Sequence, residues 1–239
     1  MTKYILVTGS SNGIGKEIAF KLIRNGFNVI FHGSNEEKLN TLKLEIPEGA
    51  DYKIWVHDFS DLKINDKYSC FFDNIIIETV VLNAGIIPIG KLKVIDLNNL
   101  KKTLNINALS QIRLCEYLST HSSLEFIYTI SSLSTIYGFK GYSLYAGSKS
   151  ILNHLNIYFN DSKLKVFSLL LGDIVKERSG LILNDSKLTN NLGRLYPFGL
   201  GSSFDVANIF FQLFIYRNHL CATQFTLDGG ITNTNIINQ

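Results

Sequence analysis

The sequence has few of the features that mark a secreted, disulfide-bonded or membrane-spanning protein. Its three cysteines, Cys70, Cys115 and Cys221, are far apart and form no CxxC pair, so neither a disulfide framework nor a thiolate metal site is expected. The N-terminal apolar run ends at Thr8, which is too early for a signal peptide. The longest later run, residues 209–216, is far shorter than the roughly 20 apolar residues of a membrane span. These absences predict a cytoplasmic protein with no membrane segment and no metal.

An excess of charge of one sign is also missing. Lys and Arg together number 23 and Asp and Glu 20, and the longest basic run is the pair Lys101-Lys102. Nucleic-acid binding requires a clustered basic face, so it is not expected. The chain has only three prolines and no linker-like tract, and 46% of its residues are hydrophobic. We therefore expect residues 1–239 to form one domain with a large core.

What the sequence does contain is an alternation of short apolar runs with longer segments of helical period, which is typical of a parallel sheet with crossover helices. We expect strands at 4–7, 28–32, 52–56, 79–82, 125–130, 166–171 and 225–227. We expect helices at 13–25, 36–44, 98–119, 144–159 and 204–216, with one more between 56 and 79. This order predicts a doubly wound, Rossmann-type α/β fold: a seven-stranded parallel sheet with helices on both faces. Ligands of such sheets bind beyond the carboxyl ends of the strands.

A glycine-rich turn, TGSSNGIG at residues 8–15, joins the first expected strand to the first expected helix. A helix N-terminus attracts anions, and glycines let a pyrophosphate approach the backbone closely. The candidate cofactor-binding residues of this turn are Gly9, Ser11, Asn12, Gly13, Ile14 and Gly15. A tight turn without a ligand is the alternative, because a glycine triplet alone is a weak signal.

The same turn matches GxSxG, the nucleophile elbow of serine hydrolases. We reject this match because only one strand precedes it, and an elbow needs an upstream strand and loop for its oxyanion hole. The five histidines show no spacing that ties one of them to Ser11 or to a metal, and each is expected to be a strand-end or surface residue.

Tyr145 and Lys149 lie four residues apart in an expected helix and so share one face of it. A free tyrosine has a pKa of about 10, and a nearby ammonium favours the phenolate. Tyr145 could therefore exchange a proton with a substrate oxygen as a general acid or base. Ser132, at the end of the preceding strand, would hydrogen-bond the reacting carbonyl or hydroxyl. A tyrosine and a lysine at this spacing also occur by chance, so the pair gains weight only together with the glycine turn.

With these motifs, the sequence resembles the short-chain dehydrogenase/reductase family, in its single-domain branch, as far as Asp228-Gly229-Gly230. Residues 8–15 resemble the family's cofactor turn. Asp58, followed by Phe59, is similar to the acidic residue that bonds the adenine amino group. Asn83-Ala84-Gly85 is similar to the motif that supports the sheet beside the cofactor.

The resemblance also implies the catalytic roles. Ser132 is preferred over Ser131 because the family's serine stands thirteen residues before its tyrosine, as Ser132 does here. Asn107 is preferred over Asn105 as the helix asparagine that holds a water in the proton relay. Tyr145 would be the acid/base, and Lys149 would lower its pKa and bond the nicotinamide ribose. Ser132 would orient the substrate oxygen.

The sequence departs from the family's pattern after the sixth strand. Residues 171–176 read LGDIVK where the family has Pro-Gly and then a threonine that touches the cofactor. The backbone of Gly172 and Ile174 is still expected to contact the carboxamide. Lys176 either reaches the pyrophosphate or points to solvent, and both remain open.

The cofactor expectation depends on the end of the second strand, FHGSN at residues 31–35. An aspartate there would bind both ribose hydroxyls and repel a 2'-phosphate, and its absence favours NADP(H) over NAD(H). The arginine common in NADP-dependent relatives is absent too, so Ser34, Asn35 and His32 are the candidates to bond the phosphate, more weakly than a guanidinium would.

The substrate is expected to be a small carbonyl or alcohol compound. Residues 176–197 are expected to form a lid, whose leucines favour a substrate with a hydrophobic portion and whose basic residues would tolerate a phosphate or a carrier protein, unless they are simply a solvated face. By whole-chain likeness the sequence most resembles the 3-oxoacyl-(acyl carrier protein) reductases and their relatives. The alternatives are a reductase of a sugar or polysaccharide precursor and a nucleotide-binding scaffold without catalysis. The resemblance also implies a homotetramer or homodimer built through helices 98–119 and 144–159.

Overall fold

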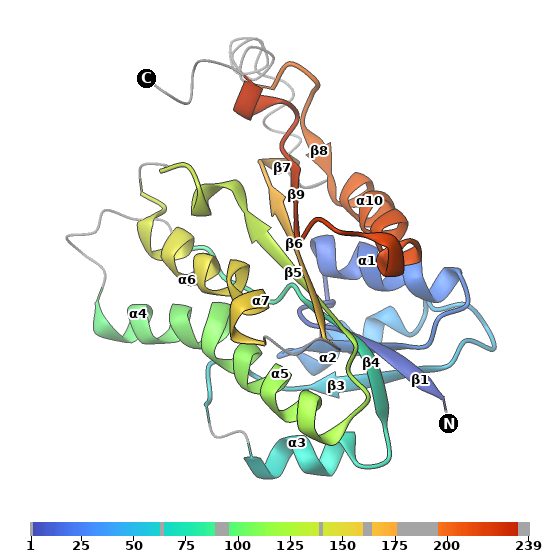
Figure 1. Ribbon diagram of the computed structural model, residues 1–239. Helices are drawn as coiled ribbons and strands as arrows, with labels where there is room; N and C mark the ends of the chain where they lie inside the picture. The colour runs from blue at the N-terminus through green and yellow to red at the C-terminus, as the bar shows by residue number, and fades with distance from the viewer. Residues whose placement is uncertain are drawn as a thin grey trace.

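The chain folds around one large parallel sheet (Figure 1). A computed structural model describes residues 2–62, 65–88, 96–138, 141–159, 164–175 and 196–233. The seven strands run in the order β3-β2-β1-β4-β5-β6-β9, and every neighbouring pair is parallel. Their bounds are β1 Lys3–Val7, β2 Val29–Gly33, β3 Tyr52–Val56, β4 Ile76–Leu82, β5 Phe126–Ser132, β6 Lys165–Leu171 and β9 Gln224–Leu227. The predicted fold class and all seven predicted strands are confirmed.

Helices cover both faces of this sheet. One face packs against α1 (Gly13–Arg24), α2 (Glu36–Leu42) and α10 (Ser203–Ile215). The other packs against α3 (Asn65–Phe72), α5 (Ser110–His121), α6 (Ser143–Asn153) and α7 (Leu155–Tyr158). Because the strands are buried from both sides, their sequences are nearly continuous apolar runs rather than alternating ones. Within the described residues, no helix has both the length and the apolar character that crossing a membrane requires.

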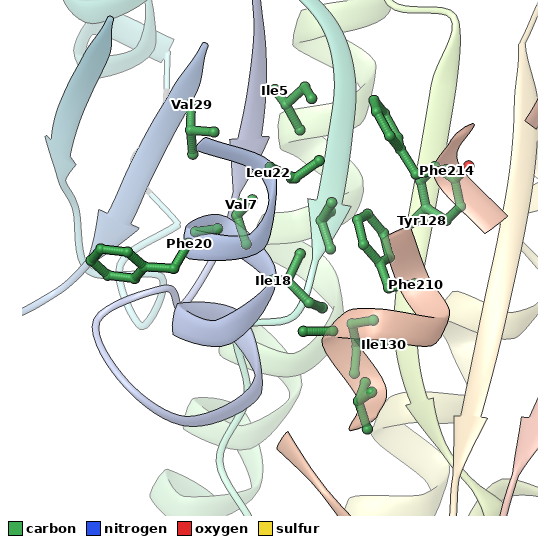
Figure 2. Packing of buried hydrophobic residues seen from close by; sticks show 14 of the residues in the cluster. Ile5, Val7, Ile18, Phe20, Leu22, Val29, Tyr128, Ile130, Phe210 and Phe214 are labelled. Atoms are coloured by element: carbon green, nitrogen blue, oxygen red, sulfur yellow. The ribbon is translucent and has the colours of Figure 1, made fainter. Parts of the chain in front are cut away.

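The core on the α1 and α10 face is built from interlocking aliphatic and aromatic side chains. Figure 2 shows Ile18 and Leu22 of α1 lying between the strands and the rings of Phe210 and Phe214 on α10. Tyr128 of β5 meets Phe210 edge to face, with ring centroids 5.0 Å apart. This packing holds α1 firmly against the sheet, so the turn that precedes α1 starts from a fixed position.

The strand order reverses beside β1. The chain runs outward from β1 to β2 and β3 on one side, then crosses over so that β4 pairs with β1 on the other side. The carboxyl ends of β1 and β4 therefore meet at the point where ligands of doubly wound sheets bind.

Two of the expected helices are not continuous. The segment expected as one helix at 98–119 consists of α4 (Leu97–Leu104), a π-helical turn (Asn105–Leu109) and α5. Within it, Nε2 of Gln111 donates to the carbonyls of Ile106 and Asn107, 3.1 Å from each, and so satisfies backbone acceptors of the widened turn.

The helix expected at 144–159 is divided at His154 into α6 and α7. Nδ1 of His154 bonds the Ser150 carbonyl at 3.0 Å, while the His154 N–H bonds the carbonyl of Ile151 instead. The ring thus replaces the backbone bond that would continue the helix.

A second, two-stranded sheet pairs β7 (Ile174–Val175) with β8 (Gly201–Ser202), and the sequence patterns did not predict it. Nearly all of the expected lid at 176–197, including Lys176, lies outside the described residues.

Candidate active site

The glycine-rich turn brings the backbone of β1 against the end of β4. Gly9 has a φ of +64°, and a Cβ there would lie 2.8 Å from Cα of Ala84. A Cβ on Gly15 would lie 2.4 Å from Nδ2 of Asn83 and 2.5 Å from the Gly9 carbonyl oxygen. Glycine at 9 and 15 is therefore required by the close approach of two chain segments.

The N-terminus of α1 can accept an anion. Asn12 is its N-cap residue but makes no side-chain hydrogen bond to the first turn, and the first turn holds no acidic residue. Gly13 has a φ of +56°, and a Cβ there would meet nothing within 4 Å. An open, uncapped helix end behind a glycine turn fits the pyrophosphate of a dinucleotide.

Asn83 clamps the end of β4 to this turn. Its Nδ2 donates to the carbonyls of Thr8 and Gly9 at 3.0 and 3.1 Å. In return, the Thr8 hydroxyl oxygen accepts from the N–H groups of Asn83 and Ala84 at 2.9 and 3.0 Å. A Cβ on Gly85 would lie 3.1 Å from Nζ of Lys149, so the same loop also reaches α6.

Tyr145 and Ser132 face each other across the carboxyl end of β5. Tyr145 is half-buried in the first turn of α6, and Ser132 is the last residue of β5. Burial raises the pKa of Tyr145, the neighbouring Tyr142 raises it further, and the hydrogen bond with Ser132 lowers it. The phenol is therefore protonated at neutral pH, and the serine hydroxyl is its bonded neighbour.

The Ser132 hydroxyl is oriented by Ser134, a residue that the motifs did not single out. The Ser132 oxygen accepts from the N–H of Ser134 at 3.2 Å and from its hydroxyl at 2.9 Å. With both acceptor positions used, the hydroxyl hydrogen of Ser132 is directed outward as a donor. A serine two residues after a strand-end serine, opening a short 3-10 turn (Leu133–Thr135), is the signal that could have identified it.

Lys149 is a buried ammonium, only 3% exposed. Its Nζ donates to the carbonyls of Ile130 and Ala84 at 3.1 and 3.4 Å. Desolvation lowers the pKa of Lys149 to about 8. Burial is the largest cause acting on the Tyr145 pKa, and the role that the resemblance implies for this lysine, to lower that pKa, stays a prediction.

The two candidate asparagines have different surroundings. Asn107, in the π-helical turn, is fully buried; its Nδ2 donates to Ser148 Oγ on α6 and to the Ile86 carbonyl, at 2.9 Å each. Asn105 instead donates to the Ser60 carbonyl at 3.0 Å. Of the two asparagines, only Asn107 connects α6 with the loop after β4.

At the end of β2, Ser34 and Asn35 are exposed, and Asn35 caps α2 by accepting from the Lys38 N–H at 2.8 Å. Ser11 lies close by, because a Cβ on Gly33 would be 3.3 Å from its Oγ. His32, in contrast, is only 2% exposed inside β2, with both ring nitrogens in hydrogen bonds. The expectation that His32 bonds a phosphate is therefore wrong, whereas its expected place near a strand end is confirmed, because β2 ends one residue later at Gly33.

The loop after β3 carries Asp58 and Phe59. Asp58 is exposed, and its Oδ1 accepts from the Ser60 N–H at 2.8 Å. The Phe59 ring is buried against His32, with ring centroids 4.4 Å apart. Only the backbone of Phe59 can therefore contact a cofactor, while the Asp58 carboxylate reaches the surface of the site.

Gly172 and Ile174 lie where β6 ends. The Gly172 N–H bonds the Leu227 carbonyl at 2.9 Å, and Ile174 pairs with Gly201 of β8. Of the two backbone groups of Gly172, the N–H is thus already used within the protein.

Tyr196 is a further residue that the motifs did not identify. It is buried, packs on Leu133 and Ile231, and donates a hydrogen bond to Asp173. This bond joins a residue that precedes the segment 176–195 to the residue that follows it. The partners are 23 residues apart in the chain, and no local pattern links them.

These residues gather at the switch point of a doubly wound sheet, where ligands of such sheets bind, next to the side chains of Ser132, Tyr145 and Lys149. Comparison with known proteins gives the family: the sequence model described as short chain dehydrogenase matches residues 3–160, about two thirds of the chain. The protein belongs to the short-chain dehydrogenase family, and the predicted resemblance is confirmed.

Named relatives match parts of the chain. The 17-beta-hydroxysteroid dehydrogenase type 3 of Danio rerio is 29% identical over 120 residues, covering 47% of this chain and 39% of the relative. The very-long-chain 3-oxoacyl-CoA reductase of Homo sapiens is 32% identical over 120 residues, covering 48% and 38%. The chain thus spans about two fifths of the length of these curated relatives. The expected likeness to 3-oxoacyl reductases is thus found, at 32% identity over about half of this chain.

Solved structures match the whole fold. A 4-hydroxyisoleucine dehydrogenase complexed with NADH superposes with a TM-score of 0.85 at 19% identity, covering 98% of this chain and all of the other (100%). A short chain dehydrogenase from Burkholderia cenocepacia J2315 in complex with NADP gives 0.79 at 24%, covering 96% and 98%. At these identities the likeness establishes the fold.

We predict that Gly15→Ala destabilises the protein by about 1–3 kcal/mol, because the new methyl group would overlap the Asn83 amide and the Gly9 carbonyl. Gly147→Ala is the matched control: a Cβ there meets nothing within 4 Å, so a gain of about 0.5–1 kcal/mol is expected in α6. Urea unfolding measures both. Equal effects at the two positions would contradict the close packing of the turn.

The lowered pKa of Lys149 leads to a second prediction, on how the free energy of unfolding depends on pH. Its pKa is about 8 in the folded protein, against about 10.4 unfolded, so between these values only the unfolded chain holds the proton. Below pH 8 the free energy of unfolding is therefore reduced by the full cost of burying the charged ammonium. It rises as the pH increases from 8 to about 10.4. Relative to Lys149→Met, the wild type should gain about 2–3 kcal/mol between pH 7.5 and 10 in urea unfolding. If the difference in free energy of unfolding between the two proteins does not change with pH, Lys149 is not a buried ammonium with a lowered pKa.

Proposed function

We propose that the protein is an NAD(P)-dependent oxidoreductase that interconverts a carbonyl and a secondary alcohol. The observation that carries this proposal is the convergence of Tyr145, Ser132 and Lys149 beside an uncapped helix N-terminus and its glycine turn. The dinucleotide, when bound, supplies or accepts the hydride. The protein's own residues supply position and the proton.

In the reducing direction, the Tyr145 hydroxyl donates its proton to the carbonyl oxygen. The raised pKa keeps this phenol protonated at neutral pH, which suits an acid. Ser132 donates a hydrogen bond to the same oxygen, since its own oxygen already accepts from Ser134. The serine thereby holds the substrate oxygen within reach of the phenol.

Lys149 and Asn107 complete the proton path in this proposal. The Lys149 ammonium lies at the junction of β5, the loop after β4 and α6, where it would bond the ribose hydroxyls of the nicotinamide. Its positive charge favours the phenolate in the oxidising direction. Asn107, held between Ile86 and Ser148, would place the relay water.

The cofactor-binding residues proposed are those of the turn, the Asp58 loop, the Asn83 loop and the ends of β2 and β6. They are Gly9, Ser11, Asn12, Gly13, Ile14, Gly15, Ser34, Asn35, Asp58, Phe59, Asn83, Ala84, Gly85, Tyr145, Lys149, Gly172 and Ile174. NADP(H) is favoured because no carboxylate stands at residues 31–35, and Ser11, Ser34 and the Asn35 amide offer donors there. Similar solved proteins hold NADH in one case and NADP in another.

For the substrate we propose a 3-oxoacyl thioester, free or on a carrier protein. The support is the similarity to a very-long-chain 3-oxoacyl-CoA reductase, together with the apolar residues between 176 and 195. A sugar or polysaccharide precursor is the second candidate within the same reaction class. A nucleotide-binding scaffold is the weaker alternative, because its only support is the altered sequence at 171–176.

We also propose that the chain is one domain, acts in the cytoplasm and forms a homodimer or homotetramer. An apolar groove between α5 and the α6–α7 junction supports the last point. It is lined by Ile112, Ile151, His154, Leu155, Ile157 and Tyr158, of which Ile157 is 69% and Tyr158 60% exposed. A second copy related by a two-fold axis would bury these side chains.

Tyr145→Phe should lower turnover at least about 1,000-fold, because it removes the transferred proton and keeps the ring. Tyr142→Phe is the matched control, one helical turn earlier, and should keep its turnover within about 3-fold. A panel of 3-oxoacyl thioesters and sugar ketones gives the rates, and fluorescence titration with NADPH and NADH gives the affinities. Unchanged cofactor affinity with lost turnover is expected. Substantial residual activity in Tyr145→Phe would overturn the assignment, and binding without turnover in the wild type would favour the scaffold.

Ile157→Asp should shift the wild-type oligomer to monomers, since it places a charge in the apolar groove. Leu44→Asp, at an exposed leucine after α2, should leave the assembly unchanged. Light scattering measures both masses. A wild-type monomer at micromolar concentration would contradict the proposed assembly.

A further inference from the structure

We propose that His32 is a positioning residue that joins two cofactor-binding segments, the glycine-rich turn and the loop of His57 to Phe59, through one neutral imidazole. The proposal deepens the proposed function, since it assigns a role in dinucleotide binding to a side chain that touches no ligand. It concerns a residue that neither the catalytic constellation nor the cofactor motif includes.

His32 is bonded to both segments at once. Its Nδ1 accepts from the Gly9 N–H at 3.1 Å, and its Nε2 lies 3.1 Å from the His57 carbonyl oxygen. Its backbone N–H donates to Ser10 Oγ at 2.9 Å, and its carbonyl accepts from the Ser10 N–H at 2.8 Å. The end of β2 therefore holds Gly9 and Ser10 on one side and His57 on the other.

These partners determine the tautomer of the ring. The Gly9 N–H can only donate, so Nδ1 carries no proton, and the His57 carbonyl can only accept, so Nε2 carries one. A doubly protonated ring would place two donors face to face at Gly9. The arrangement works only for neutral histidine.

The surroundings keep the ring neutral and fixed. His32 stacks on Phe59 at 4.4 Å between centroids and lies tilted against Trp55 at 4.6 Å. Burial, together with the smaller effect of the neighbouring His57, lowers the pKa of His32 to about 3, although the His57 backbone bond and Asp58 act in the opposite direction. At working pH the imidazole is an uncharged spacer of fixed length.

The segments that it joins are two of those proposed above to bind the dinucleotide. Gly9 precedes the uncapped N-terminus of α1, and His57 directly precedes the exposed Asp58. Loss of the imidazole would remove the acceptor of the part-buried Gly9 N–H and a donor to the buried His57 carbonyl, and a buried polar group that loses a hydrogen-bond partner costs free energy. Both segments would then relax, and dinucleotide binding would have to reorder them.

Three substitutions separate the two bonds. His32→Asn places an oxygen near Nδ1 and keeps the Gly9 bond; His32→Gln places an amide near Nε2 and keeps the His57 bond; His32→Leu removes both. Hydrogen exchange without cofactor should rise at residues 57–60 in the Asn variant, at 8–15 in the Gln variant and at both in the Leu variant. If hydrogen exchange rises equally at residues 8–15 and 57–60 in every variant, or rises at neither segment, His32 does not join the two segments as proposed.

The consequence for binding is measured on the same proteins. Trp55 is the only tryptophan of the chain and touches the His32 ring, so its fluorescence follows the cluster during titration with NADPH. We expect the Kd to rise about 3- to 10-fold in the Asn and Gln variants and more than about 10-fold in the Leu variant. The exposed His121→Gln is the matched control and should bind like the wild type.

The outcomes distinguish this proposal from the proposed function. A wild type that binds neither NADPH nor NADH would refute both, even if hydrogen exchange showed the coupling. Wild-type binding with an unchanged Kd in all three variants would refute only the role of His32 and leave it a structural residue. If His32→Leu does not fold, the Asn and Gln variants still give opposite exchange patterns, and identical patterns would refute the proposal.

Discussion

The hydrogen bonds between Thr8 and Asn83 are the interaction on which the rest of the site depends. They join the carboxyl ends of β1 and β4, the two strands between which the sheet reverses its order. The bond from Asn83 to the Gly9 carbonyl then fixes the first glycine of the turn, and only glycine at 9 and 15 permits this approach. With the turn fixed, the N-terminus of α1 presents its unpaired N–H groups at one place.

The same junction sets the electrostatics of the site. Gln111 donates to the Ala84 carbonyl at 2.9 Å, and the same carbonyl accepts from Lys149, so the loop after β4 is held from α5 and from α6. The lysine is thereby buried against carbonyl dipoles, which bear part of the cost of desolvation. Among the residues that the structure describes, none forms an ion pair with Lys149, so its charge stays one helical turn from Tyr145 without being neutralised.

Much of the fold could be predicted from the sequence, because strands covered on both faces must be apolar throughout and the segments between them show helical period. The spacing of Tyr145 and Lys149 indicated a shared helix face for a similar reason. Features that depend on contacts between distant residues could not be predicted. The π-helical turn at Asn107 needs the Gln111 side chain, and the Asp173–Tyr196 bond joins residues across an intervening segment. A histidine within an apolar strand gives no sign that its two nitrogens join two loops.

The central claim is that this edge of the sheet holds a nicotinamide cofactor beside a reacting carbonyl carbon, and isotope transfer tests it most directly. The wild-type protein would be mixed with NADPH or NADH deuterated at both C4 positions of the nicotinamide and a panel of 3-oxoacyl thioesters and sugar ketones. Mass spectrometry of the products then locates the label. The account predicts an alcohol with one deuterium on the former carbonyl carbon. Cofactor binding with no deuterium in any product would contradict it.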